Sequence, residues 1–159
     1  MPVFAVLLIR SNDGHSNAAA AVFFVAGVTD QIDGYLARRW HVESRFGAVA
    51  DPLADRLMID VAVLLLWWDG RLPLLGLIVI VARDVLLLTG ARLLQPRGLE
   101  VKVNFIGKAA TWGLYASIFF VMVTPEGTLW PLVCFWIGLG LALIAGVQYV
   151  LTARKELRT

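Results

Sequence analysis

The sequence predicts an all-α integral membrane protein, built as a six-helix transmembrane bundle. Of its 159 residues, 59% are hydrophobic and only 16% are charged, and the mean hydropathy is +0.76, more apolar than the core of a soluble domain requires. The apolar blocks recur at lengths near the roughly 20 residues of one membrane crossing. Polar turns separate these blocks. We therefore expect one transmembrane domain over residues 1–159, with no separate soluble domain.

The first two apolar blocks differ in length. Met1 to Ile9 is about half as long as a spanning helix. It is either an interfacial segment or, as we favour, the tail of a first span whose beginning is missing, so the first helix is expected to be truncated. After a polar turn, a helix is expected from Asn17 to about Ala37.

Four further helices complete the expected bundle. The third begins between Arg45 and Asp51 and ends at the pair Trp67-Trp68, with Pro52 either in its first turn or at a kink. The remaining helices are expected over Pro73 to about Leu94, Phe105 to about Val123, and Trp130 to about Leu151.

The basic residues predict the orientation of the bundle. Of the 14 Lys and Arg residues, all but Arg10, Arg71 and Arg83 belong to the side that carries the connection after the second helix. By the positive-inside rule this side, together with the C-terminus, faces the cytoplasm. We expect a prokaryotic inner or plasma membrane. A net charge of +2 gives no reason to expect nucleic acid as a partner.

Four carboxylates stand within this apolar sequence: Asp30, Asp33, Asp51 and Asp55. Helical spacing places Asp30, Asp33 and Arg38 on one stripe of the second helix. It also places Asp51 and Asp55 on one face of the third. The plain alternative is that these carboxylates only pair with arginines across the connecting loop.

Carboxylates at membrane depth are costly unless they pair with cations or line a wet cavity. Four together repel one another unless cations lie between them, and oxygen ligands with no nearby His or Cys favour Mg²⁺ or Mn²⁺ over zinc. Two divalent ions in such a site can bridge phosphate oxygens. Arg38 adds a planar fork for a phosphate group. These residues predict a site for metal ions and phosphate.

The same stretch resembles a family signature. Eight residues match the signature of the CDP-alcohol phosphatidyltransferase family position for position: Asp30, Asp33, Gly34, Ala37, Arg38, Gly47, Asp51 and Asp55. The later segment from Val103 to Thr111 is similar to the Gly-Lys...Thr segment of the phosphatidylglycerophosphate synthase and cardiolipin synthase branches. The resemblance covers most of the chain, since the six-helix arrangement of the family agrees with the apolar blocks.

The resemblance implies a reaction in which an acceptor hydroxyl attacks the lipid-side phosphorus of CDP-diacylglycerol and CMP leaves. It implies two divalent ions held by Asp30, Asp33, Asp51 and Asp55, with Asp55 also acting as the general base. Homodimers embedded among membrane lipids are common in the family and are expected here. The residues implied in binding the cytidine diphosphate are Asp33, Gly34, Ala37, Arg38 and Gly47.

The acceptor is less closely specified. Glycerol 3-phosphate is the first expectation, with Arg83 and Lys108 as candidate acceptor-binding residues. Phosphatidylglycerol, giving cardiolipin, is the alternative, because a Lys often found in the family at the position of Ala110 is missing here. Inositol phosphate is third. Arg83 is alternatively a structural partner of Asp60 or Asp84.

Two readings from other functional classes remain open. A cation transporter would use the aspartates as its ion site. An inactive paralogue would serve as an assembly partner. Metal-dependent release of CMP separates the enzyme from both.

Overall fold

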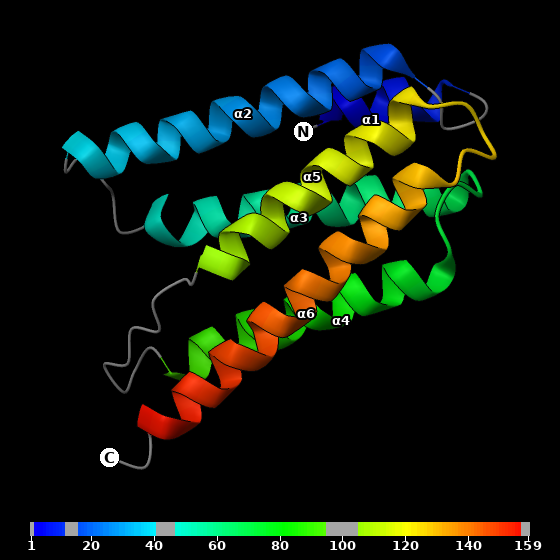
Figure 1. Ribbon diagram of the computed structural model, residues 1–159. Coiled ribbons are helices and arrows are strands. Elements are labelled where there is room, and N and C mark those ends of the chain that lie inside the picture. Colours follow the sequence, from blue (N-terminus) through cyan, green and yellow to red (C-terminus); the bar gives the residue numbers. More distant parts are fainter. Residues whose placement is uncertain (1, 12–15, 41–46, 95–104, 157–159) are drawn as a thin grey trace.

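The described part of the chain is entirely helical. The computed structural model describes residues 2–11, 16–40, 47–94 and 105–156, and these residues contain no β-strand. Six helices follow one another, each joined to the next by a short connection or by residues outside the described ranges (Figure 1). Their bounds are α1 Pro2–Ile9, α2 Asn17–Trp40, α3 Gly47–Trp68, α4 Leu74–Leu94, α5 Phe105–Val123 and α6 Trp130–Glu156.

The expected helices are confirmed, with shifts at some of their ends. α2 continues to Trp40 and α6 to Glu156, beyond the apolar blocks that predicted them. α3 begins at Gly47, so Pro52 falls in its second turn and not in its first. Polar and charged residues can extend a helix once its apolar part is packed, which apolar blocks alone do not reveal.

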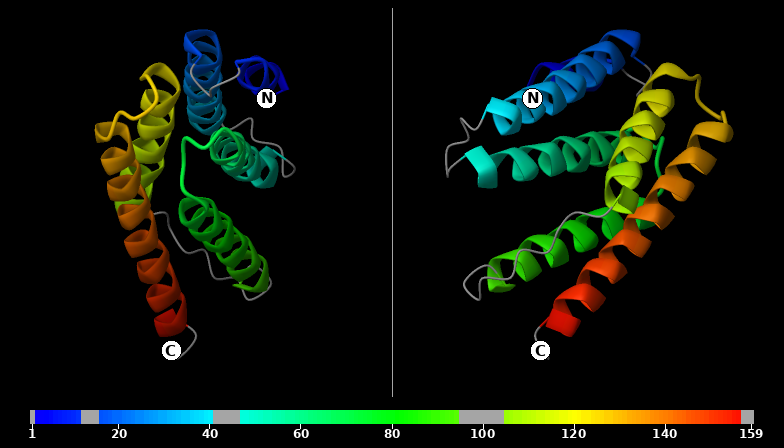
Figure 2. Two further views of the ribbon diagram at one scale, coloured as in Figure 1. Left: turned by 90° about the vertical axis from the view of Figure 1, so that its right-hand side faces the viewer. Right: turned by 60° about the vertical axis from the view of Figure 1, so that its left-hand side comes forward.

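The core is one cluster to which all six helices contribute, including Ile80 of α4 and Phe135 of α6. The Phe23 ring contacts Phe4 of α1 at 5.5 Å and Tyr115 of α5 at 5.3 Å between ring centroids. Ala19 and Ala20 let neighbouring helices approach α2, and both are fully buried. The short α1 therefore packs against α2 with the face that carries Phe4 and Leu8, while Val6 and Ile9 stay exposed. In Figure 2, α4 and the second half of α6 extend away from this core.

α5 and α6 pack closely through glycines. A Cβ atom placed on Gly138 would lie 3.2 Å from the backbone carbon of Gly113 and 3.2 Å from the backbone nitrogen of Leu114. Backbone cannot move aside as a flexible side chain can. Gly140, two residues later, has no such neighbour within 4 Å among the described atoms. Gly138 is thus a packing residue.

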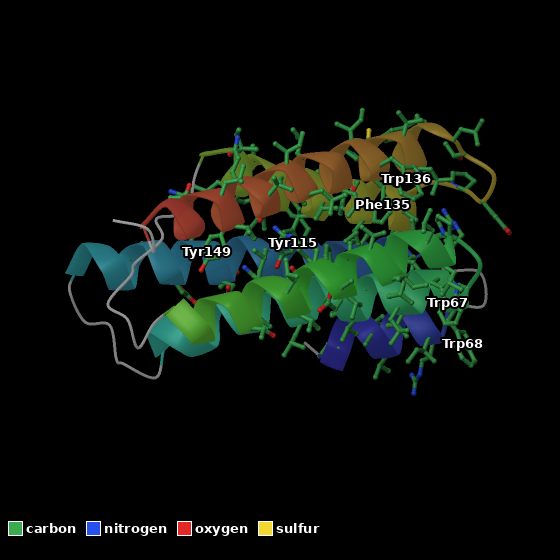
Figure 3. The ribbon with its side chains drawn as sticks, turned by 90° about the horizontal axis from the view of Figure 1, so that it is seen from below. Trp67, Trp68, Tyr115, Phe135, Trp136 and Tyr149 are labelled. Carbon is green, nitrogen blue, oxygen red and sulfur yellow. The ribbon has the colours of Figure 1, made fainter. Side chains whose placement is uncertain are left out.

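One end of the bundle is held by hydrogen bonds between the connections. The α3–α4 turn contains Gly70 with φ of 73° and the buried Arg71. Nη2 of Arg71 donates to the carbonyl oxygens of Val121 and Thr124, each at 2.6 Å, at the end of α5. The amide of Ser16 donates to the carbonyl of Met122 at 3.0 Å. Trp67 and Trp68 lie at the same end, far from Tyr149 (Figure 3).

Two described helices have the length and hydropathy needed to cross a membrane. These are the segments Ile106–Val123 in α5 and Trp130–Thr152 in α6. Large apolar side chains also lie exposed on other helices, among them Trp68 of α3, which is 79% exposed. Exposed apolar side chains of this size and number suit contact with lipid.

A substitution at Gly138 tests the close α5–α6 contact. We expect Gly138→Ala to be less stable than the matched Gly140→Ala by about 1–3 kcal/mol, because the new methyl group meets backbone only at the first position. Both changes gain the same helix propensity, so the comparison isolates the packing. Thermal unfolding of both variants in one detergent measures the difference, and equal stabilities would contradict the close approach.

Candidate active site

Two of the predicted carboxylates lie on the second half of α2. Asp30 is half-buried and Asp33, about one turn later, is exposed. The first half of the same helix is anchored in the core by Phe23, so the acidic turn continues a well-packed segment. Gly34, Ala37 and Arg38 follow on the same helix. The structure thus confirms the helical spacing on which the predicted stripe depends.

The other two carboxylates belong to the first half of α3. Asp51 and Asp55 are four residues apart on a continuous helix that begins at Gly47. The side chains of these residues, and those of Ala37 and Arg38, lie outside the described part of the structure. What the structure gives for them is the helical backbone, which puts Asp51 and Asp55 on one face.

The two acidic segments come to a similar level of the bundle. α2 and α3 run in opposite directions, with the end of α2 and the start of α3 on the same side (Figure 1). At 1.5 Å per residue, Asp30 lies roughly 15 Å before the end of α2 and Asp55 roughly 12 Å after the start of α3. Residues far apart in the sequence are therefore brought to one depth. That their side chains converge remains a prediction.

The donor chemistry of this region fits hard divalent cations. Among the described side chains, no three His, Cys, Asp or Glu residues form a group that would hold a metal ion. Asp30 and Asp33 are among these side chains, whereas Asp51 and Asp55, which the predicted site also requires, are not. All four side chains offer carboxylate oxygen, the ligand type that Mg²⁺ and Mn²⁺ prefer.

A second group of charges lies between α3 and α4. Oδ1 of Asp84 is 2.6 Å from Nη1 of Arg83 and 3.6 Å from Nη1 of Arg56. The Asp84 side chain is only 4% exposed, whereas that of Arg56 is 29% exposed. Asp60, one turn after Arg56, lies within electrostatic range of all three. We call Arg56, Asp60, Arg83 and Asp84 the charge cluster.

The charge cluster keeps unused hydrogen-bonding capacity. Within the described residues, three of its buried atoms have no hydrogen-bond partner: Nη1 of Arg56, Oδ1 of Asp60 and Nε of Arg83. Two of these are donors and one is an acceptor. Tyr149 of α6 is also near Arg56, so the cluster extends toward a third helix. The atoms are suited to a polar group with both phosphate and hydroxyl character.

The structure shows which carboxylate pairs with Arg83, which the sequence left open between Asp60 and Asp84. Arg83 is paired with Asp84, while the described hydrogen bonds include none to the buried oxygen of Asp60. Sequence reasoning missed Arg56 as a member of the cluster. The available signal was its spacing of four residues from Asp60, which puts both on one face of α3.

Lys108 and Ala110 have different surroundings on α5. Lys108 is exposed near the start of the helix. Ala110 is fully buried in the core. Thr111, beside it, donates its hydroxyl hydrogen to the carbonyl of Gly107 at 3.0 Å. Of these residues, Lys108 is the one that presents an exposed positive charge to a ligand.

Comparison with known proteins decides the family. The family model described as CDP-alcohol phosphatidyltransferase matches residues 1–147, which include both acidic helices and the charge cluster. This chain belongs to the CDP-alcohol phosphatidyltransferase family. The resemblance drawn from the acidic signature is confirmed.

Two curated relatives of this phosphatidyltransferase align with nearly the whole chain. A CMP-forming cardiolipin synthase of Streptomyces coelicolor is 36% identical, over 99% of this chain and 79% of its own length. A CDP-diacylglycerol–glycerol-3-phosphate 3-phosphatidyltransferase of Escherichia coli is 32% identical, over 99% of this chain and 90% of its own length. The two branches named by the sequence resemblance are thus both among the relatives.

Removing the charge of Asp84 tests the charge cluster of this phosphatidyltransferase. We expect Asp84→Leu to lower the free energy of unfolding by about 3–5 kcal/mol, because it leaves buried guanidinium charge without its partner. The double variant Asp84→Leu/Arg83→Leu removes both charges and is expected to recover part of the loss. Thermal unfolding in detergent measures both.

The exposed Glu126 in the α5–α6 turn provides a matched control. Glu126→Gln also removes one negative charge, but at a solvated position where surface charges contribute little. If Asp84→Leu were no more destabilising than Glu126→Gln, the ion pairs of Asp84 would have no structural role.

Proposed function

We propose that the protein transfers a phosphatidyl group from CDP-diacylglycerol to glycerol 3-phosphate, forming phosphatidylglycerophosphate and releasing CMP. The observation that carries this proposal is the family signature on two antiparallel helices, in a chain that belongs to the CDP-alcohol phosphatidyltransferase family. The relative from Escherichia coli, which aligns over 90% of its length, is named for this donor and this acceptor. The enzyme class thus follows from the family, and the acceptor from the relative.

We further propose that all six helices form one transmembrane domain. The family and the two helices of spanning length support a membrane enzyme. The distribution of basic residues supports an active site and a C-terminus on the cytoplasmic side of a prokaryotic inner or plasma membrane. CDP-diacylglycerol would then reach the site from the surrounding lipid. A homodimer is the assembly we expect.

Asp30, Asp33, Asp51 and Asp55 are proposed to hold two divalent ions, Mg²⁺ or Mn²⁺. When bound, such ions stabilise the negative charge that develops on phosphate oxygens during transfer. Asp55 is proposed to accept the proton of the acceptor hydroxyl as that oxygen bonds to the lipid-side phosphorus. The bond from this phosphorus to the CMP oxygen breaks. CMP leaves with the electron pair.

The donor nucleotide is proposed to lie along the polar half of α2. Asp33, Gly34, Ala37 and Arg38 lie within two turns of that helix, and Gly47 begins α3 at the same end of the bundle. Small residues allow a ribose or diphosphate to approach the backbone. Arg38 would donate two parallel hydrogen bonds to a phosphate group.

Arg83 and Lys108 are proposed to bind the acceptor. Nε of Arg83 is buried without a partner among the described residues, so it keeps a donor for an acceptor oxygen. Asp84 holds the other side of the same guanidinium at 2.6 Å and would fix its orientation. Lys108, exposed on α5, would supply a second positive charge.

Phosphatidylglycerol is the second candidate acceptor, and its product would be cardiolipin. The 36% identical relative from Streptomyces coelicolor is named as a cardiolipin synthase. The fully buried alanine at position 110 also leaves Lys108 as the only lysine between residues 105 and 123. A phosphate-bearing acceptor favours more positive charge than this segment provides.

Turnover of labelled CDP-diacylglycerol with each acceptor offered separately tests this proposal. We expect Mg²⁺- or Mn²⁺-dependent release of CMP with glycerol 3-phosphate, and phosphatidylglycerophosphate as the lipid product. Cardiolipin formed from phosphatidylglycerol alone would replace the first candidate by the second. Asp55→Asn is expected to lower kcat by about 10²–10⁴-fold, the usual contribution of a positioned base.

The same assay separates the other functional classes. Ion flux without any release of CMP would indicate a cation transporter. Equal turnover by the wild type and Asp55→Asn would remove Asp55 as the base and favour an inactive paralogue. Glu126→Gln, which changes an exposed carboxylate at the end of the bundle opposite to the acidic halves of α2 and α3, serves as the matched control for Asp55→Asn.

A further inference from the structure

One carboxylate of the charge cluster has no role in the ion pairs described above. Oδ1 of Asp60 is buried and has no hydrogen-bond partner among the described residues. Asp84, the other carboxylate of the cluster, already pairs with Arg83 at 2.6 Å and with Arg56 at 3.6 Å. A buried carboxylate oxygen without a partner costs free energy, so it is expected to meet a ligand or an ordered water.

The two other unpartnered atoms of the cluster indicate the kind of ligand. Nη1 of Arg56 and Nε of Arg83 are donors, and guanidinium donors suit the oxygens of a phosphate group. An ionised carboxylate only accepts hydrogen bonds and repels a phosphate, so Asp60 requires a ligand hydrogen such as that of a hydroxyl group. A ligand that carries a hydroxyl group close to a phosphate would therefore satisfy all three atoms.

Three helices contribute to the surroundings of these atoms. The pair of Arg56 and Asp84 joins α3 to α4. Tyr149 of α6 interacts electrostatically with Arg56. Its ring packs against α4, where a Cβ atom placed on Gly90 would lie 3.9 Å from Cε1 of Tyr149. Hydrogen bonds to a ligand are stronger in such an interior than in water, because the local dielectric is lower.

The charge cluster also lies close to the predicted base in the sequence of α3. Arg56 directly follows Asp55, so the acidic face and the face that carries the cluster are neighbours on one helix. Asp60 lies five residues beyond Asp55, roughly 7.5 Å along the helix axis. A phosphorylated alcohol of three carbons is long enough to extend between these two positions.

We infer that Asp60 selects the acceptor by accepting a hydrogen bond from its secondary hydroxyl group. The inference rests on the proposed function, because it takes the acceptor to be a glycerol joined to a phosphate. Free glycerol 3-phosphate and the headgroup of phosphatidylglycerol share this chemistry. In both, the reacting hydroxyl and the phosphate are on the outer carbons and the secondary hydroxyl is on the middle carbon. Asp60 is thus a specificity-determining residue, distinct from Asp55, which is proposed to take the proton of the reacting hydroxyl.

An acceptor without the secondary hydroxyl tests the inference. 3-Hydroxypropyl phosphate differs from glycerol 3-phosphate by that group alone. We expect the wild type to favour glycerol 3-phosphate in kcat/KM by about 10–100-fold, as one hydrogen bond to a charged group would give, and Asp60→Leu to reduce this preference to about threefold or less. Asp60→Asn keeps an oxygen that can accept the same bond and should retain most of the preference.

The preference separates substrate recognition from a structural role. If Asp60 only supported the packing of α3, Asp60→Leu would lower turnover of both acceptors equally, and the unchanged preference would overturn the inference. A wild type that uses both acceptors equally well would also overturn it, without any variant. Glu126→Gln, which removes a carboxylate from the exposed α5–α6 turn, is the matched control and should leave the preference unchanged.

A second pair of acceptors distinguishes a lipid headgroup from a free phosphate. Phosphatidylglycerol and its analogue with a propanediol headgroup again differ only in the secondary hydroxyl. If the acceptor is the lipid, the preference and its loss in Asp60→Leu should occur with this pair and not with the free phosphates. Loss of the preference in neither pair would overturn the inference.

Calorimetric titration with the two free phosphates, in the absence of donor, provides a readout that needs no turnover. A binding preference that depends on Asp60, without release of CMP from any acceptor, would contradict the proposed function and leave the assignment of Asp60 standing. Release of CMP with a preference that Asp60→Leu does not alter would overturn the inference and leave the proposed function standing.

Discussion

The cost of charge inside an apolar bundle is the constraint on which this structure depends. An ionised side chain at membrane depth costs a few kcal/mol or more unless it is paired or reaches water. In the charge cluster, Asp84 offsets this cost by pairing with Arg83 on α4 and with Arg56 on α3. Arg71 offsets it by donating hydrogen bonds to two carbonyl oxygens at the end of α5. Bound metal ions would offset the same cost for the four aspartates of α2 and α3.

The molecule has one end that is held by packing and hydrogen bonds and an opposite end that carries the acidic residues. The end where α3 meets α4 and α5 meets α6 is held by short turns and by hydrogen bonds from Arg71. The acidic halves of α2 and α3 lie toward the opposite end. A firmly packed half can thus position a half that must admit lipid, nucleotide and acceptor. Such a division suits the proposed reaction between a lipid donor and a small polar acceptor.

Much of the fold, and the helical placement of the four aspartates, could be predicted from the sequence, because apolar blocks and fixed spacing are local properties of the chain. α5 begins and ends where its apolar block does. α6 continues to Glu156, because nothing in an apolar block marks where a charged tail stops being helical. The contacts of Arg71 with Val121 and of Arg56 with Asp84 depend on which helices become neighbours. That information is not local, so these contacts required the structure.

The location of bound Mn²⁺ tests the central claim most directly, namely that α2 and α3 form a metal site for phosphatidyl transfer. Anomalous X-ray scattering from crystals of the protein with Mn²⁺ and CDP-diacylglycerol would locate the ions. The account predicts Mn²⁺ between α2 and α3, bound by carboxylate oxygens of Asp30, Asp33, Asp51 and Asp55, and its loss in Asp30→Ala. Mn²⁺ at the charge cluster instead, or no bound Mn²⁺ in a protein that still releases CMP, would contradict it.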